Sequence, residues 1–253
     1  MRGITVTRYV TPLREGGSLP AIVEADDDGL YVLKFRGAGQ GVKALIAELV
    51  SGGIARVLGL PVPEIVFASV HPDLARTEPD PEIHALIHDS AGLNLAIDFL
   101  PGSVSYDPVV HTLAPDLSSR IVWFDAYVTN VDRTPRNTNM LMWHRQPWLI
   151  DHGATLYFHH SPGWESDAHR ARAAFPAIRE HVLLRAATAL RDVDAEMAAK
   201  LTVERIDGIL STVPDEWLAG ERPPEVQRHA YRRYLLDRLA PPRAFVEEAA
   251  RAR

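Results

Sequence analysis

The sequence of 253 residues contains no cysteine. Disulfide bonds, thiolate nucleophiles and thiolate metal sites are therefore excluded. The chain also lacks any run of about 18 apolar residues, which a membrane-spanning helix would need. Its first residues lack the apolar core of a signal peptide, so we expect a cytoplasmic protein without a membrane segment. The net charge of −6 argues against a basic binding groove, and no nucleic-acid partner is expected.

Lysine is also scarce, because only Lys34, Lys43 and Lys200 occur among the 27 basic residues. In a chain that otherwise uses arginine, a lysine inside the apolar segment LYVLKF is a candidate functional residue. The remaining composition, 46% apolar and 24% charged, is typical of a soluble globular protein. The length is sufficient for one large domain or for a compact protein of two lobes.

The apolar pattern predicts strands in the first part of the chain and helices in the second. Alternation predicts strands over 4–10, 21–25, 29–35, 64–70 and 93–100, and spacing of three and four residues predicts a helix over 39–60. Residues 71–91, rich in proline, aspartate and histidine, are expected to form a loop with at most a short helical turn.

A Pro-Gly break at 101–102 marks the expected boundary between a domain of residues 1–100 and a domain of residues 101–253. Beyond it, the pattern predicts a helix with a serine cap over 117–130, two strands over 139–143 and 147–151, and helices with short proline breaks over about 176–252. Strands first and helices later is the order of a two-lobed α+β protein.

Lys34 needs a partner if its ammonium group is buried, because an unpaired buried charge is costly. Glu48 is the candidate, as the only acid within the apolar stretch of the predicted helix. Such a pair would hold a point charge against nucleotide phosphates. The alternative is a lysine on an edge strand with its ammonium group in solvent.

The turn that contains Gly16, Gly17 and Ser18 lies between two predicted strands. Its backbone N–H groups could surround a phosphate, although a plain hairpin turn would explain the same residues.

The segments NVDRTPRNTNML and LIDHG place polar residues at the ends of predicted strands. Asp132 and Asn137 lie five residues apart before one strand, and Asp151 ends the next. Oxygen ligands of this kind suit Mg²⁺. In phosphoryl transfer, an aspartate that orients the attacking hydroxyl precedes an asparagine and a second aspartate that bind the metal. Each residue alone could be a turn former or a strand-end cap, but the combined order with Lys34 and Glu48 favours phosphoryl transfer.

These segments, together with GGSLPAIVEADDDGLYVLKF, resemble the HipA-like kinases and, more distantly, the phosphatidylinositol 3- and 4-kinases. The resemblance runs from about residue 12 to residue 155. It implies a two-lobed, protein-kinase-like α+β fold. The first lobe would be an antiparallel sheet plus one helix, and the second would be mainly helical.

The resemblance also implies ATP and Mg²⁺ as ligands. Asp132 would be the catalytic base, and Asn137 and Asp151 would hold Mg²⁺. Nucleotide contacts would come from Gly16, Gly17, Ser18, Lys34 and Glu48, and from the backbone around Asp98 to Leu100 as the adenine hinge.

The predicted function is an ATP-dependent phosphotransferase that moves the γ-phosphate to a hydroxyl, with a protein serine or threonine as the acceptor. A small-molecule kinase, similar to the aminoglycoside phosphotransferases, is an alternative. A nucleotide-binding pseudokinase scaffold is another, because Thr134 stands where the family more often has a histidine. An Asp132→Ala variant would distinguish an enzyme from a scaffold.

Overall fold

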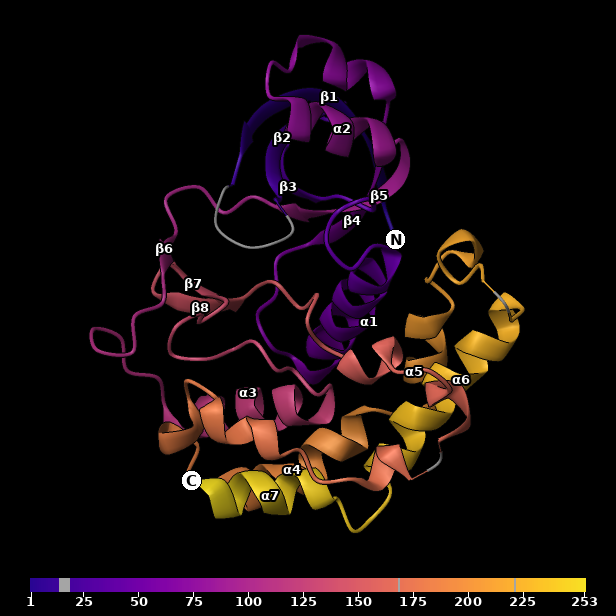
Figure 1. The fold of residues 1–253 in the computed structure, drawn as a ribbon. Helices are drawn as coiled ribbons and strands as arrows, with labels where there is room; N and C mark the ends of the chain where they lie inside the picture. The colour runs from indigo at the N-terminus through magenta and orange to yellow at the C-terminus, as the bar shows by residue number, and fades with distance from the viewer. Residues whose placement is uncertain (14–18, 168, 221) are drawn as a thin grey trace. The chain divides into compact units, whose positions relative to one another are not determined.

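A computed structural model describes residues 1–13, 19–167, 169–220 and 222–253 of the chain (Figure 1). Contacts between Cα atoms divide the chain into two compact units. The first comprises Met1–Leu49 with Pro63–Gly102, and the second comprises Val50–Val62 with Ser103–Arg253. The division into domains 1–100 and 101–253 stays a prediction.

The first unit is built on a closed barrel of five strands, in the order β1-β2-β3-β5-β4 (Figure 1). Four of its pairings are antiparallel, but β1 runs parallel to β4. The predicted antiparallel sheet is therefore corrected to a mixed one. Strand β1 is long enough to pair with two neighbours. Its register with β2 shifts at two places, and register shifts of this type, as in β-bulges, bend a strand. The strands are β1 (Gly3–Pro12), β2 (Ala21–Ala25), β3 (Leu30–Lys34), β4 (Ile65–Val70) and β5 (Gly92–Asp98).

The segment between β4 and β5 is helical, which corrects the prediction of a loop over 71–91. It contains the 3₁₀ helix η1 (Pro72–Thr77) and the α-helix α2 (Pro81–Asp89). The Asp80 side chain accepts a hydrogen bond from the Glu82 amide at 3.0 Å, and proline occupies the first turn of α2. Proline and aspartate thus start this helix. Its buried face, Ile83 and Ile87, joins the apolar core of the barrel.

Helix α1 (Val42–Leu58) occupies most of the predicted range 39–60. It ends at Gly59, whose φ of 80° is readily adopted only by glycine. The Leu60 amide then donates to the Ala55 carbonyl at 2.9 Å, which closes the last turn in a Schellman-type cap.

The second unit contains a small antiparallel sheet in the order β6-β7-β8. Strands β7 (Met140–Trp143) and β8 (Gln146–Leu149) match the predicted strand pair, and β6 (Val104–Ser105) is an addition.

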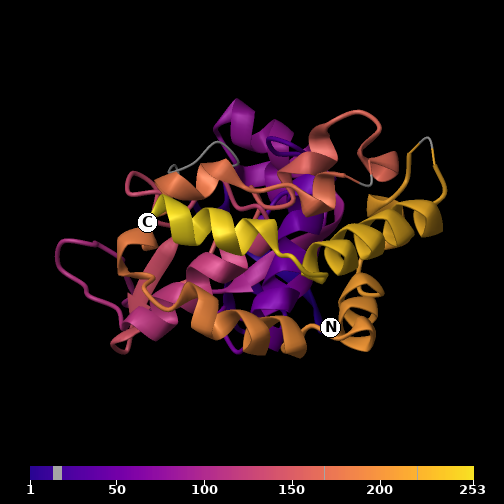
Figure 2. The same cartoon turned by 90° about the horizontal axis from the view of Figure 1, so that it is seen from below.

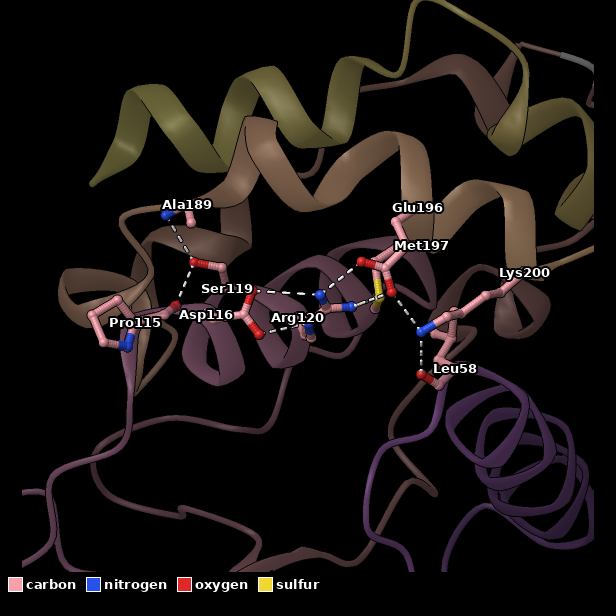
Figure 3. Close-up of polar contacts among 9 residues, drawn as sticks. All are labelled: Leu58, Pro115, Asp116, Ser119, Arg120, Ala189, Glu196, Met197 and Lys200. Carbon is pink, nitrogen blue, oxygen red and sulfur yellow. Dashed lines mark hydrogen bonds and ion pairs between the residues drawn. The ribbon is translucent and has the colours of Figure 1, made fainter.

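Helix α3 (Pro115–Tyr127) has no side-chain cap, because Ala114 precedes its first residue. This corrects the predicted serine cap. Ser119 instead donates to the Pro115 carbonyl at 2.7 Å and accepts from the Ala189 amide at 2.9 Å (Figure 3).

The rest of the second unit is helical, as predicted, but short 3₁₀ helices precede the α-helices. Helix α7 packs against α3 and α4, and Figure 2 views these helices from below. None of the helices in the described part of the chain is both long and apolar enough to cross a membrane. The elements are η2 (Tyr157–His160), η3 (Trp164–Ser166), η4 (Arg170–Arg172), η5 (Pro176–Glu180), η6 (Leu184–Ala186), α4 (Leu190–Lys200), α5 (Val203–Leu210), η7 (Asp215–Trp217), α6 (Pro224–Leu239) and α7 (Ala244–Ala252).

A chain of ion pairs joins α3 to α4 at the surface of this unit (Figure 3). Arg120 donates to Glu196 at 2.7 Å and to Asp116 at 2.7 Å. Lys200 lies 2.8 Å from Glu196 and 3.3 Å from the Leu58 carbonyl at the end of α1. Hydrogen bonds from Arg120 and Lys200 lower the pKa of the Glu196 carboxyl to about 2.

Candidate functional site

In the first unit, the structure brings Lys34 and Glu48 together. Lys34 is the last residue of β3 and pairs with Leu95 of β5, while Glu48 lies on α1. The Lys34 Nζ atom is 3.5 Å from Glu48 Oε2, and the two side chains are 11% and 2% exposed. Both charges are almost removed from water, so each stabilises the other. The ammonium group is thereby held at the end of a barrel strand.

The predicted adenine contacts lie at the end of β5. The backbone N–H of Asp98 donates to the Glu64 carbonyl at 2.8 Å, and that of Phe99 donates to the Leu30 carbonyl at 3.1 Å. These two amides are thus already engaged. Burial and the charge of Glu64 raise the pKa of the Asp98 carboxyl. A hinge contact would therefore use the Asp98 carbonyl or the backbone of Leu100.

The predicted phosphate turn lies outside the described residues. It comprises Gly16, Gly17 and Ser18.

In the second unit, the loop after α3 holds the Asp132 carboxylate between two amides. Asn137 Nδ2 donates to Asp132 Oδ2 at 2.7 Å, and Asn139 Nδ2 donates to the same oxygen at 3.0 Å. The backbone N–H of Asp132 donates to Asn130 Oδ1 at 3.0 Å. Both side chain and backbone of this half-buried aspartate are thus oriented by asparagines.

The same contacts define where a cation would bind. A carboxylate only accepts hydrogen bonds, so the atom of Asn137 that faces Asp132 must be the amide nitrogen. The exposed Asn137 Oδ1 accepts no hydrogen bond from a described residue and remains available. Asp151 follows β8 with a φ of 55°, half-buried. Its neighbour Ile150 donates from its amide to the Asn139 carbonyl at 3.0 Å, which links this segment to the Asp132 loop.

Asn137 and Asp151 offer one amide and one carboxylate oxygen, which fits Mg²⁺ because this ion keeps several waters and phosphate oxygens as ligands. Across the described ranges, no group of three or more histidine, cysteine, aspartate or glutamate side chains could hold a metal ion. A metal site here would therefore rest on few protein ligands.

A buried ionic cluster lies behind the Asp132 loop. Arg133 Nε donates to Asp125 Oδ2 at 2.6 Å, and both side chains are 0% exposed. His181 Nε2 lies 2.8 Å from the same oxygen, and Asn130 Nδ2 donates to Asp125 Oδ1 at 2.7 Å. The backbone of Arg133 also accepts a hydrogen bond from the Val182 amide at 3.1 Å. The loop is thus fastened both to α3 and to the segment around residue 181.

The segment after Asp151 contributes several buried side chains to the interior of the second unit. His152 and His159 are fully buried. His159 Nδ1 is 2.9 Å from the Tyr231 hydroxyl, and its Nε2 is 3.1 Å from His160 Nε2. Trp164 is also buried, with its ring 4.6 Å from that of Tyr231 on α6. These side chains form part of an aromatic core.

Sequence reasoning missed Asp125, Arg133, Asn139 and His181. One signal was available, because Asp125 interrupts the apolar run IVWFDAYV just as Glu48 interrupts the apolar face of α1. An acid within an apolar helix face requires a buried partner. The identity of that partner was not readable, since Arg133 and His181 lie 8 and 56 residues away.

Comparison with known proteins assigns the family. Residues 6–240 match the HipA-like kinases. The chain belongs to this family. Comparison with curated proteins found no match.

Solved structures similar to this HipA-like kinase are also kinases. The proinflammatory kinase CtkA of Helicobacter pylori shares 13% identity and a TM-score of 0.57, over 99% of this chain and 97% of that one. The Golgi casein kinase, solved with Mn and ADP bound, shares 11% identity and a TM-score of 0.50, over 96% and 74% of the two chains. At these identities the likeness establishes a kinase-like fold, and the family places the chain among the phosphotransferases.

Proposed function

We propose that this HipA-like kinase moves the γ-phosphate of ATP to a hydroxyl group, with a protein serine or threonine as the acceptor. The observation that carries the proposal is the Asp132 carboxylate, held by Asn137, with the oxygen of that amide left available for a cation. This is the relation expected between a group that orients a nucleophile and an adjacent metal ligand.

In the proposed reaction, Asp132 orients the acceptor hydroxyl towards the γ-phosphorus and accepts its proton. Lys34, held by Glu48, stabilises negative charge on the α- and β-phosphates. Asn137 and Asp151 would hold Mg²⁺, which supplies charge neutralisation on the phosphate oxygens when bound. Most of the rate enhancement would come from positioning and electrostatic stabilisation. The Mn and ADP bound to the Golgi casein kinase support nucleotide and divalent-metal use in this fold.

The first test is thermal unfolding with ADP or ATP, with and without Mg²⁺. A ligand at a hundredfold excess over its dissociation constant stabilises the folded state by about 2.7 kcal/mol, or roughly 5–10 °C for a protein of this size. We expect this shift to depend on Mg²⁺ and to disappear in Asp151→Asn. Asp28→Asn is the matched control. Asp28 lies in a surface turn and, like Asp151, has a left-handed backbone conformation, with a φ of 60°. No shift with any nucleotide would refute the proposed site.

The second test separates an enzyme from a nucleotide-binding scaffold. Asp132→Asn preserves size but removes the base, so kcat for ATP turnover should fall by about 10²–10⁴. The Mg²⁺-dependent thermal shift should persist, and Asp28→Asn should leave turnover unchanged. Turnover would be followed as ADP release and as radiolabel in protein or small-molecule hydroxyl acceptors. If nucleotide binds but neither the unaltered protein nor Asp132→Asn turns over ATP, the chain is a scaffold. Equal turnover in the two proteins would show that Asp132 is not the base.

A further inference from the structure

Asn139 connects the proposed catalytic base to the strand pair that carries Asp151. It directly precedes β7, is 8% exposed and has a φ of 46°. Its amide donates to Asp132 Oδ2 at 3.0 Å. Its carbonyl accepts from the Ile150 amide at 3.0 Å and from the Arg133 guanidinium. One residue therefore contacts the base, the segment beside Asp151 and the buried arginine.

Asn139 and Asn137 both donate to Asp132, but their surroundings differ. Asn137 is exposed and has an oxygen available for a cation, whereas Asn139 is buried and anchored through its own carbonyl. Two donors on Oδ2 restrict rotation of the carboxylate. The buried donor is the more rigid of the two, because its backbone is held from two sides. Both of these donors leave Oδ1 without a hydrogen bond from a described side-chain amide.

Arg133 holds Asn139, and Asp125 in turn holds Arg133. The Asp125–Arg133 pair is fully buried, and His181 and Asn130 complete the hydrogen bonds to the Asp125 carboxylate. Such a cluster has little freedom to rearrange, because each charge depends on the others for solvation. The position of the Asn139 carbonyl is therefore fixed by the interior of the second unit.

We propose that Asn139 is a positioning residue for phosphoryl transfer, which orients the Asp132 carboxylate through its amide and is itself fixed by Arg133. The proposal rests on the proposed function. A small displacement of a reacting group is sufficient to cost about a hundredfold in rate.

The left-handed backbone allows a clean variant. Asparagine and glycine adopt positive φ more readily than other residues. Asn139→Gly thus retains the backbone conformation and the carbonyl that accepts from Arg133 and Ile150, and it removes only the amide that contacts Asp132. Arg145→Gly is the matched control, because Arg145 has a φ of 64° in the exposed turn of the same hairpin.

The experiment measures kcat and KM for ATP turnover, together with melting temperature, for the unaltered protein, Asn139→Gly, Arg145→Gly and Asp132→Asn. We expect Asn139→Gly to lower kcat by roughly ten- to a hundredfold and to change KM for ATP by less than about threefold. Its melting temperature should match that of Arg145→Gly. Asn139→Asp should also lower kcat, because it retains the shape but replaces the donor with a second carboxylate beside Asp132.

Two outcomes overturn the proposal in distinguishable ways. If Asp132→Asn abolishes turnover while Asn139→Gly retains it, Asn139 has no positioning role and the proposed function stands. If the unaltered protein and Asp132→Asn show the same turnover, or none, the proposed function fails and this inference fails with it. Retention of kcat in Asn139→Asp would belong to the first outcome, because it would show that the amide donor of Asn139 is not required.

Discussion

Asp125 is an acid in the apolar centre of a helix, and its ionisation is coupled to folding. Burial alone would raise its pKa, but the charge of Arg133 and the hydrogen bond from His181 outweigh burial and hold the pKa well below its usual range. His181 Nδ1 accepts from the Leu183 amide at 3.0 Å, so the proton of a neutral ring lies on Nε2, facing Asp125. The carboxylate is thus fully hydrogen bonded in the folded state.

Asp125→Asn should destabilise the protein by about 3 kcal/mol at pH 7, because it leaves Arg133 as an uncompensated buried charge. A carboxyl with a lowered folded-state pKa contributes stability above its unfolded pKa, about 4, and loses it as the pH falls through the folded value. The free-energy difference from the unaltered protein should therefore be constant from pH 7 to about 5. It should shrink below pH 4. Urea unfolding at several pH values measures it.

The control for this prediction is Asp116→Asn on the same helix. Asp116 is 63% exposed and pairs with Arg120 at the surface, so its loss should cost less than about 1 kcal/mol. Equal losses in the two variants would contradict a special role for the buried pair.

At the scale of the helices, α6 contributes a buried arginine that contacts the end of α3. Arg238 is 2% exposed and donates to the Ala126 and Tyr127 carbonyls at the end of α3, each at 2.9 Å. It also donates to the Ala171 and Ala173 carbonyls, each at 3.0 Å. Its positive charge lies against the carbonyl end of α3, where the helix dipole favours a cation.

Arg238→Met should lower the free energy of unfolding by at least about 3 kcal/mol, because methionine fills space but leaves buried carbonyls without donors. Arg232→Met is the matched control on the same helix. Arg232 pairs with Asp207 at 2.6 Å, but the two side chains are 36% and 45% exposed, so its loss should cost less than about 1 kcal/mol. Urea unfolding compares the two. A similar loss in both would show that the carbonyl contacts of Arg238 contribute little.

At the same scale, the β7–β8 hairpin connects two segments that carry proposed site residues. Its last pair, Met140 with Leu149, is extended by the hydrogen bond from Ile150 to Asn139. This extension connects the loop of Asp132 with the segment of Asp151. The spacing between Asn137 and Asp151 predicted two strands, and the structure contains them. The left-handed residues Asn139 and Asp151 flank the hairpin where regular pairing ends.

For the molecule as a whole, fold and family agree, although identity with the similar solved structures is low. The likeness to CtkA extends over 99% of the chain at 13% identity. A fold tolerates such divergence when apolar periodicity and core volume are kept. The family match over residues 6–240 therefore complements the structural likeness, since it rests on sequence.

The amino-acid sequence was sufficient for features that depend on neighbours in the chain. Apolar periodicity located the barrel strands, α1 and the β7–β8 pair. Motif order singled out Lys34, Glu48, Asp132, Asn137 and Asp151 as candidate site residues, and their roles stay a prediction. Prediction from the sequence failed at α2, where proline and aspartate were interpreted as loop formers although they begin a helix. It also did not predict the parallel pairing of β1 with β4, because that pairing joins residues more than 60 positions apart.

The order of candidate residues, their types and the family are readable from the chain alone. The amide of Asn139 on Asp132, the burial of Asp125 against Arg133 and His181, and the closure of the barrel depend on tertiary structure. Side chains distant in sequence are selected as partners by burial and hydrogen-bond geometry, and a linear pattern records neither. A polar residue in an apolar run indicates that a partner exists, and only the folded chain determines which one.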